Sequence, residues 1–298
     1  MIGAVDIGGT KIAVGMLDRY GRILSRRENP SGTGLALPEG LRLIFSMLRE
    51  TAREAGGELE GIGVGCTGPV DPLTGTLGQI EFLSGWQGCH LSTELQDVFG
   101  VTAFLENDAD AAALGELAWG AGKDAKRFIY VTVSTGIGGG LVFDGRLYRG
   151  VDGSHPEIGH HVIDPSGPLC FCGAHGCWES LASGPALAAR AGLPSALATC
   201  QAAEAGDAAA RLAVEQEAWH LGLGFANLVT LFIPDVIALG GGVMHSRHLF
   251  WDRILQTIRE NCGLVPFEKT RLVPAQLGAE AGLVGAAQVW IKGSQFYD

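Results

Sequence analysis

The chain has no apolar run long enough to span a membrane and no cluster of lysine and arginine. Among its 298 residues, 21 are Lys or Arg and 32 are Asp or Glu, so the formal net charge is −11. A membrane-spanning helix needs about 20 consecutive apolar residues, and a protein that follows a nucleic-acid backbone needs a basic surface. We therefore expect neither a membrane nor nucleic acid as a partner.

The N-terminus lacks the features of a secretory leader, because Met1 leads directly into an apolar strand without a basic segment or a small-residue cleavage site. The chain has seven cysteines, and this odd number is not typical of a disulfide-bonded scaffold. We expect a protein of a reducing compartment, located in the cytoplasm. The length allows two domains, each with its own core.

The sequence also lacks a Walker loop and a dinucleotide-binding fingerprint, although it contains 46 glycines. Three glycine-rich turns each follow an apolar strand: Asp6 to Lys11 (DIGGTK), Ser134 to Gly140 (STGIGGG) and Gly240 to Val243 (GGGV). Glycine lets a phosphate approach the backbone N–H groups of such a turn. A single turn of this kind is equally typical of a plain hairpin, but the combination of three favours a nucleotide site.

The side chains of these turns have the chemistry that a magnesium nucleotide requires. Thr10 and Thr135 offer hydroxyl groups to phosphate, Lys11 offers a positive charge, and Asp6 offers a carboxylate that can hold Mg²⁺ through water.

The most specific stretch runs from Glu157 to Glu179 and reads EIGHHVIDPSGPLCFCGAHGCWE. Its three cysteines lie within eight positions, in a turn-rich segment that is too short to be a helix face. Three thiolates and one imidazole form the closed ligand set of structural zinc. The cysteines are Cys170, Cys172 and Cys177, the preferred fourth ligand is His160, and the competing ligands are His155, His161 and His175. Buried packing cysteines or a disulfide are the alternatives.

The spacing of apolar residues predicts an α/β protein built from two related halves. Each half opens with strand, glycine turn, strand, polar turn and strand. The expected strands cover residues 2–7, 11–17, 23–27, 62–64, 101–105, 128–133, 146–148 and 236–239, with a further strand after the second glycine turn. The expected helices cover 38–55, 91–99, 108–119, 246–262 and 280–290, together with alanine-rich helices between 184 and 232.

The segment FLENDAD, from Phe104 to Asp110, places Asn107 and Asp108 where a strand ends and a helix begins. One interpretation is structural, with Asn107 or Asp108 as the N-cap and Glu106 and Asp110 complementing the helix dipole. The functional interpretation makes Asp108 a general base, because ligands lie at the carboxyl ends of strands in open α/β sheets. Phosphoryl transfer needs such an oriented nucleophile.

These motifs resemble the ROK family of sugar kinases and repressors. DIGGTK, GCTGPVDP, LENDADAAALGE, STGIGGG, GSHPEIGHH, CFCGAHGCWE and IALGGGV occur in the order and spacing of that family over essentially the whole chain. The repressor branch carries a DNA-binding segment ahead of the first strand, and we expect none here. The residues His155-Pro156 depart from the small residue and glycine that relatives often have before this glutamate.

The resemblance implies two ribonuclease H-like domains of the actin-like ATPase fold, with an interdomain cleft and a structural zinc loop at 160–177. The expected domains are 1–118 with 280–298, and 119–279. The implied activity is ATP-dependent phosphorylation of a hexose, with glucose as the commonest substrate, with Mg²⁺, and in a homodimer or homotetramer. Asp108 is the implied base, and the implied sugar contacts are Gly68, Asn107, Asp108, Glu157, His160 and Glu179. The implied nucleotide contacts are Asp6, Gly8, Gly9, Thr10, Lys11, Thr135, Gly136, Gly241 and Gly242, and the implied zinc ligands are His160, Cys170, Cys172 and Cys177.

Three alternatives stay open at this point. The substrate could be an N-acetylhexosamine or fructose, because discrimination between sugars depends on the shape of the pocket. A sensor would bind sugar without consuming ATP. An actin-like or chaperone-like ATPase would leave the zinc loop unexplained.

Overall fold

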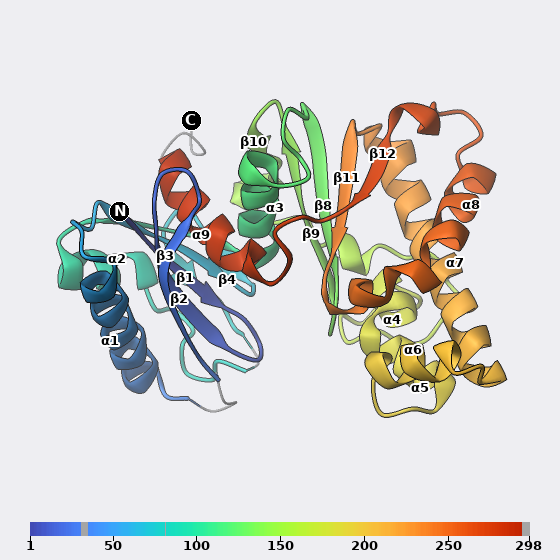
Figure 1. Cartoon of the computed structure of the whole chain (residues 1–298), viewed down its shortest axis with the longest axis horizontal. Helices are drawn as coiled ribbons and strands as arrows, with labels where there is room; N and C mark the ends of the chain where they lie inside the picture. The colour runs from blue at the N-terminus through green and yellow to red at the C-terminus, as the bar shows by residue number, and fades with distance from the viewer. Residues whose placement is uncertain (31–34, 81, 294–298) are drawn as a thin grey trace. The chain divides into compact units, whose positions relative to one another are not determined.

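The structure is a computed structural model that describes all residues except 31–34, 81 and 294–298 (Figure 1). By its internal contacts the chain divides into two compact units. Unit 1 comprises Met1–Asp124, Gly140–Pro156 and Gln276–Asp298, and unit 2 comprises Ala125–Gly139 and Glu157–Ala275. Residues 140–156 group with unit 1, whereas the sequence-based division placed them in the second domain. The domain boundaries at 118/119 and 279/280 stay a prediction.

Unit 1 is built on a mixed sheet of five strands in the order β3-β2-β1-β4-β7. Strand β1 pairs antiparallel with β2 and parallel with β4, so that Asp6 lies opposite Ala13 on one side and Gly65 on the other. The expected opening of three antiparallel strands is confirmed. The strands are β1 (Ile2–Ile7), β2 (Ile12–Leu17), β3 (Ile23–Asn29), β4 (Gly61–Cys66) and β7 (Thr102–Asn107).

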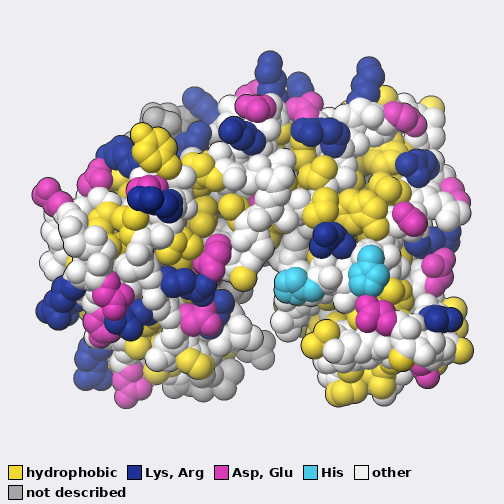
Figure 2. Space-filling view, viewed as in Figure 1, with side chains coloured by type: hydrophobic (Ala, Val, Ile, Leu, Met, Phe, Trp, Pro, Cys, Tyr) yellow, Lys and Arg dark blue, Asp and Glu magenta, His cyan; other side chains and the backbone are white. Residues whose placement is uncertain are grey.

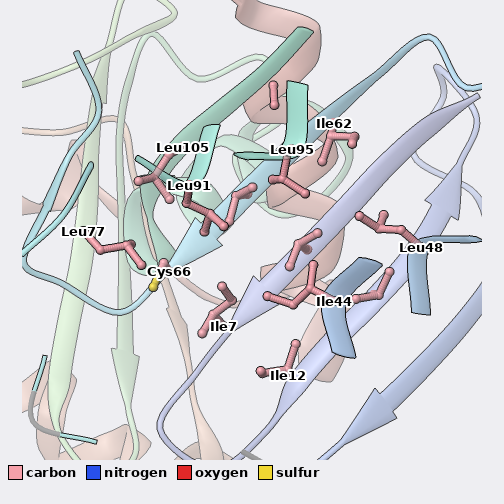
Figure 3. Close-up of a cluster of buried hydrophobic side chains, with 14 of the residues drawn as sticks. Ile7, Ile12, Ile44, Leu48, Ile62, Cys66, Leu77, Leu91, Leu95 and Leu105 are labelled. Carbon is pink, nitrogen blue, oxygen red and sulfur yellow. The ribbon is translucent and has the colours of Figure 1, made fainter. Parts of the chain in front are cut away.

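Alternate residues of β1 pack on opposite faces of this sheet. Val5 and Ile7 join a core with α1 (Leu37–Ala55) and α2 (Leu91–Phe99), and Figure 3 shows part of this cluster. Ile2 and Ala4 instead pack with the closing helix α9 (Ala281–Lys292). This confirms the helix expected over residues 280–290. By the same alternation Asp6 lies on the α9 face.

Glycines in β4 allow α9 to lie directly on the strand. A Cβ at Gly63 would collide with the carbonyl of Ala286, and a Cβ at Gly61 would collide with the Trp290 ring. The backbone of β4 therefore takes the place of a side-chain layer, and the helix approaches the sheet more closely than usual. Helix α3 (Asp108–Trp119) packs mainly against α9.

The other elements of unit 1 are short. They are the two-stranded sheet β5 (Val70–Asp71) and β6 (Thr76–Leu77), the strand β10 (Arg146–Leu147), and the 3-10 helices η1 (Val151–Gly153) and η5 (Gly278–Glu280).

The second five-stranded sheet has the order β10-β9-β8-β11-β12. Counted along the chain this is third, second, first, fourth, fifth, the same order as in the first sheet, and it agrees with the expected internal repeat. Its further strands are β8 (Arg127–Val133), β9 (Ile137–Phe143), β11 (Val236–Gly240) and β12 (Arg271–Pro274). The second glycine turn is shorter than expected, because Ile137 already begins β9 and Gly138 to Gly140 belong to the strand.

The helices of unit 2 follow the zinc-loop segment. They are η2 (Ile158–His160), α4 (Trp178–Ala182), α5 (Gly184–Ala191), α6 (Ala196–Glu204), α7 (Ala208–Phe232), η3 (Gly242–Leu249), α8 (Trp251–Asn261) and η4 (Phe267–Lys269). The single helix expected over 246–262 is wrong at its start, because the chain forms η3 first and Ser246 departs from helical dihedral angles.

Acidic and basic side chains are interspersed over the face of the molecule in Figure 2. None of the helices in the described part of the chain combines the length and apolar character that a membrane span requires.

Candidate functional site

The turn after β1 is a tight hairpin turn. The N–H of Gly8 donates to the carbonyl of Lys11 at 3.0 Å, and Gly9 and Thr10 are exposed. Lys11 Nζ lies 3.0 Å from Glu28 Oε2 and is partly exposed. The turn thus presents backbone N–H groups, a hydroxyl and a cation next to Asp6.

The surroundings of the buried Asp6 carboxylate raise its pKa. Burial and the nearby charge of Asp108 raise its pKa to about 7, against an opposing effect of Lys11. The backbone of Gly282, in the first turn of α9, lies so close that a Cβ there would collide with the Asp6 carboxylate. A buried acid beside a second acid is a position where a cation is favourable.

Asn107 takes the structural N-cap role that the sequence left open between Asn107 and Asp108. Asn107 is the N-cap of α3, since its Oδ1 accepts from the N–H groups of Ala109 and Asp110. The Asp108 carboxylate accepts from Thr67 Oγ1 at 2.7 Å and from the Ala109 N–H at 2.8 Å. Burial raises the pKa of Asp108, although both hydrogen bonds oppose this. Asp108 thus lies at the carboxyl end of β7 as a poorly solvated carboxylate.

Gly68 lies against the Asn107 amide. A Cβ at Gly68 would be 3.2 Å from Asn107 Nδ2, and the following peptide bond to Pro69 is cis. The structure therefore brings Gly68, Asn107 and Asp108 together in unit 1, next to Asp6.

Two charged pairs around Asp108 were missed by the sequence interpretation, which treated Glu106 and Asp110 as dipole-complementing charges. Both carboxylates are almost fully buried. Glu106 pairs with Arg149, and Asp110 Oδ2 lies 2.7 Å from His155 Nδ1. Burial and the charge of Asp110 raise the pKa of Glu106 against the effect of Arg149. His155, a competing zinc ligand in the sequence analysis, instead contacts Asp110.

The four preferred zinc ligands converge in unit 2. One donor atom from each of His160, Cys170, Cys172 and Cys177 lies within 4.8 Å of the others. His160 Nδ1 is 3.5 Å from Cys170 Sγ, and Cys172 Sγ is 3.5 Å from Cys177 Sγ. Ligands about 2.1 to 2.3 Å from a tetrahedral zinc ion have separations of this size. The donor set and its spacing therefore fit zinc.

The two other candidate imidazoles of this segment have different partners. His161 Nδ1 lies 2.5 Å from the carbonyl oxygen of Ile158, and its ring packs against Trp178. His175 Nδ1 lies 3.2 Å from the carbonyl of Gly167. Neither belongs to the cluster of four donors.

The two glutamates that bracket the zinc loop are placed differently. Glu157 is exposed and directly precedes η2, which carries His160. Glu179 is half-buried, and its Oε2 accepts from the Ile137 N–H at 2.7 Å. Gly136 lies against the same carboxylate, since a Cβ there would collide with it. Glu179 therefore connects the zinc loop to the turn that contains Thr135 and Gly136.

Unit 2 also contains a cavity of about 470 Å³ between the second glycine turn, α5, α6 and the start of η3. Thr135 and Gly242, two of the nucleotide contacts implied by the sequence, line this cavity, and Gly241, which directly precedes Gly242, has a φ of +94°. Its volume suits a small ligand. Residues that sequence reasoning missed here include Leu197 and His245. They follow no motif, so no local signal marked them.

The rings of Trp86 and Trp178 are both fully buried. Trp86 Nε1 donates to the carbonyl of Leu35 at 2.9 Å, and Trp178 Nε1 donates to that of His220 at 3.1 Å. Both are packing residues.

Comparison with known proteins assigns this arrangement to a family. The model of the ROK family matches residues 2–293. The chain belongs to the ROK family. This protein is 36% identical over 309 residues to a glucokinase from Streptomyces coelicolor, with 96% of each chain covered. It is 35% identical to an N-acetylmannosamine kinase from Citrobacter koseri, over 95% of this chain and 96% of that protein.

Two solved structures share the fold of this ROK protein. A ROK hexokinase from Thermus thermophilus superposes with a TM-score of 0.88 at 36% identity, covering 99% of each chain. A ROK glucokinase from Streptomyces griseus, crystallised with glucose and AMPPNP, gives a TM-score of 0.81 at 34% identity, over 97% of this chain and 98% of that one. The fold is α/β with mixed sheets, as in these kinases.

Proposed function

We propose that this ROK protein is an ATP-dependent sugar kinase that phosphorylates the terminal hydroxyl of a hexose, with glucose as the preferred substrate. The observation that carries the proposal is Asp108, a poorly solvated carboxylate at the end of β7 that is oriented by Thr67. The relatives of this chain that have a comparable length include glucokinases at 30% and 36% identity.

Asp108 acts as the general base in this proposal. A raised pKa makes a carboxylate a better proton acceptor, and the hydrogen bond from Thr67 keeps it in one orientation. The sugar hydroxyl gives its proton to Asp108 as its oxygen attacks the γ-phosphorus of ATP, and the bond between that phosphorus and the β,γ-bridging oxygen breaks to release ADP. Positioning contributes most of the rate enhancement in phosphoryl transfer.

The nucleotide contacts in the proposal come from the glycine turns and the cavity of unit 2. Backbone N–H groups of the Asp6–Lys11 and Thr135-Gly136 turns bind phosphates, and Gly241 with Gly242 lies by the adenosine. Oxygen donors are what Mg²⁺ prefers, and the crowding of Asp6 and Asp108 fits a nearby cation. When bound, Mg²⁺ neutralises part of the phosphate charge.

Zinc has a structural role in the proposal. The four donors form a closed set without a vacant position for water. His160 faces the cluster through Nδ1, which leaves Nε2 for a hydrogen bond to sugar. We assign sugar contacts to Gly68, Asn107, Asp108, Glu157, His160 and Glu179. Carboxylate and amide groups of this kind suit a neutral polyol. In this proposal the two units are ribonuclease H-like domains of the actin-like fold.

The substitution Asp108→Asn tests the proposed base. Loss of the proton acceptor should lower kcat by about 100-fold or more while glucose binding, measured by calorimetry, stays close to wild type. The matched control is Asp97→Asn, because Asp97 is an exposed acid on α2. Normal turnover by the Asp108→Asn protein would eliminate the base assignment.

An ADP-release assay over a panel of sugars tests the substrate class. We expect release that depends on sugar, with the highest kcat/KM for glucose. A preference for N-acetylmannosamine, N-acetylglucosamine or fructose would replace glucose as the assigned substrate. Release without sugar would indicate an ATPase, and sugar binding without release would indicate a sensor.

A further inference from the structure

One ion pair and one carboxylate–imidazole contact hold one loop against the turn that carries Asp108. The acids Glu106 and Asp110 flank Asn107-Asp108 in the sequence, and their partners Arg149 and His155 lie six residues apart in the segment after β10. Exposed side-chain fractions are 1% and 0% for the acids and 10% and 12% for Arg149 and His155. The loop is therefore attached to the start of α3 at two buried points.

The environment of Asp110 requires a cationic partner. Its Oδ2 contacts His155 Nδ1, whereas its Oδ1 is buried and has no hydrogen-bond partner among the described residues. Gly140 of β9 closes this side, since a Cβ there would lie 2.9 Å from Asp110 Oδ1. A buried carboxylate with one unpaired oxygen is costly unless a positive charge lies beside it. A protonated His155 supplies that charge.

The pair lies within electrostatic reach of Asp108. A protonated His155 lowers the pKa of Asp108, and Asp110 raises it. The other titratable groups around Asp108 are Asp6 of β1 and Cys66 of β4. Among these groups, His155 is the one that brings positive charge to Asp108, and Lys11 acts on Asp6.

We propose that His155, held by Asp110, is a positioning residue for Asp108, which fixes the loop at 149–155 against the first turn of α3 and places an imidazolium beside the base. The inference rests on the proposed kinase function. It also gives a role to His155, one of the two residues at which the motif before Glu157 departs from the resemblance. Asp110 is necessary for this role, because its contact with Nδ1 determines the orientation of the His155 ring.

The pH profile of kcat/KM distinguishes this role from a purely structural one. Asn at position 155 retains an N–H donor near the place of Nδ1 but cannot become charged, so His155→Asn should keep the contact to Asp110. Without the positive charge the pKa of Asp108 rises, and the acid limb of the profile should move up by roughly 0.5 to 1 unit. The matched control is His248→Asn, because His248 also pairs with a carboxylate, Glu204, but at an exposed site of unit 2. Superimposable profiles for wild type and His155→Asn would overturn the proposal.

A measurement that needs no activity tests the pair itself. In NMR titrations of the histidine ring signals, the resonance missing in His155→Asn identifies His155. Replacing Asp110 by Asn should lower the pKa of His155 by about one unit or more, because the ionised partner is lost. An unchanged titration would show that the two side chains do not interact and would overturn the proposal. If wild type has no sugar kinase activity, the proposed function fails, whereas the titration still decides whether the pair exists.

Discussion

Burial sets the proton affinity of the two acids at the centre of unit 1. Asp6 and Asp108 belong to different elements, yet desolvation raises the pKa of both, and the charge of Asp108 adds to the rise at Asp6. An unperturbed aspartate has a pKa near 3.8, whereas the pKa of Asp6 is raised to about 7. At the residue scale, the surroundings of an aspartate therefore determine how tightly it binds a proton.

The raised pKa of Asp6 predicts a pH-dependent stability. The folded state binds the proton more tightly than the unfolded state, so this contribution to stability is complete below about pH 4 and is lost as pH rises through about 7. Asp6→Asn is neutral throughout and is not subject to this loss. In metal-free protein, the free energy of unfolding of Asp6→Asn minus that of wild type should increase between pH 5 and pH 8.

Urea denaturation at four pH values in that range measures the difference. We expect a gain on the order of 1 kcal/mol, because each unit of pKa corresponds to about 1.4 kcal/mol and surrounding solvent reduces the effect. A difference that stays constant with pH would show that Asp6 ionises in the folded state as it does in the unfolded chain.

Helix α9 makes its closest contacts with neighbouring elements at glycines, where there is no Cβ atom. Helix α9 lies on β4 because Gly61 and Gly63 leave room for it, and Gly282 at its start touches the Asp6 carboxylate. The position of α9 therefore limits where the Asp6 carboxylate, at the start of the first glycine-rich turn, can lie. At the element scale, α9 joins the core to the candidate site.

Gly282→Ala should displace Asp6 while leaving the helix intact, since alanine is the better helix former. The added methyl group collides with the carboxylate, and misplacement of a site residue by about 1 Å can lower kcat/KM roughly 10- to 100-fold. Steady-state kinetics with varied magnesium nucleotide, alongside thermal melting, measures both effects. The control is Gly263→Ala, where a Cβ has open space. Full activity in Gly282→Ala would show that Asp6 can move without consequence.

Each unit has features that stabilise it independently. The cluster of Figure 3 belongs to unit 1, whereas the four zinc-type donors belong to unit 2. Two units with separate sources of stability need not unfold in one transition. At the scale of the whole molecule, metal removal should therefore affect the units unequally.

Calorimetry with and without a zinc chelator tests this expectation. The chelator should lower the melting temperature of one transition, and Cys172→Ser should do the same without chelator. Leu105→Ala, which removes a fully buried side chain of unit 1 at a cost of about 2 to 5 kcal/mol, should lower the other. Elemental analysis of purified wild type should find one zinc per chain. Protein without zinc, or with melting unaffected by the chelator, would contradict the structural metal.

Much of the fold could be predicted from local patterns. The alternation in Ile2–Ile7, the apolar spacing in α1 and the glycine that ends it each act within a few residues, so the order of strands and helices followed. The start of α8 could not be predicted from the sequence. The residues from Gly242 to Leu249 form 3-10 turns, which leave no distinct pattern of apolar residues.

The amino-acid order by itself determined the zinc-type donor set, the glycine turns and the place of Asp108 at a strand end. Neighbouring residues dictate such features, since a short turn-rich segment holds its own cysteines near one another. Only the tertiary structure decided that Asp110 meets His155, that Glu106 meets Arg149, and that Asp6 is crowded by Asp108. These contacts join segments more than forty residues apart, and their energies depend on exclusion of water, which a linear pattern does not record.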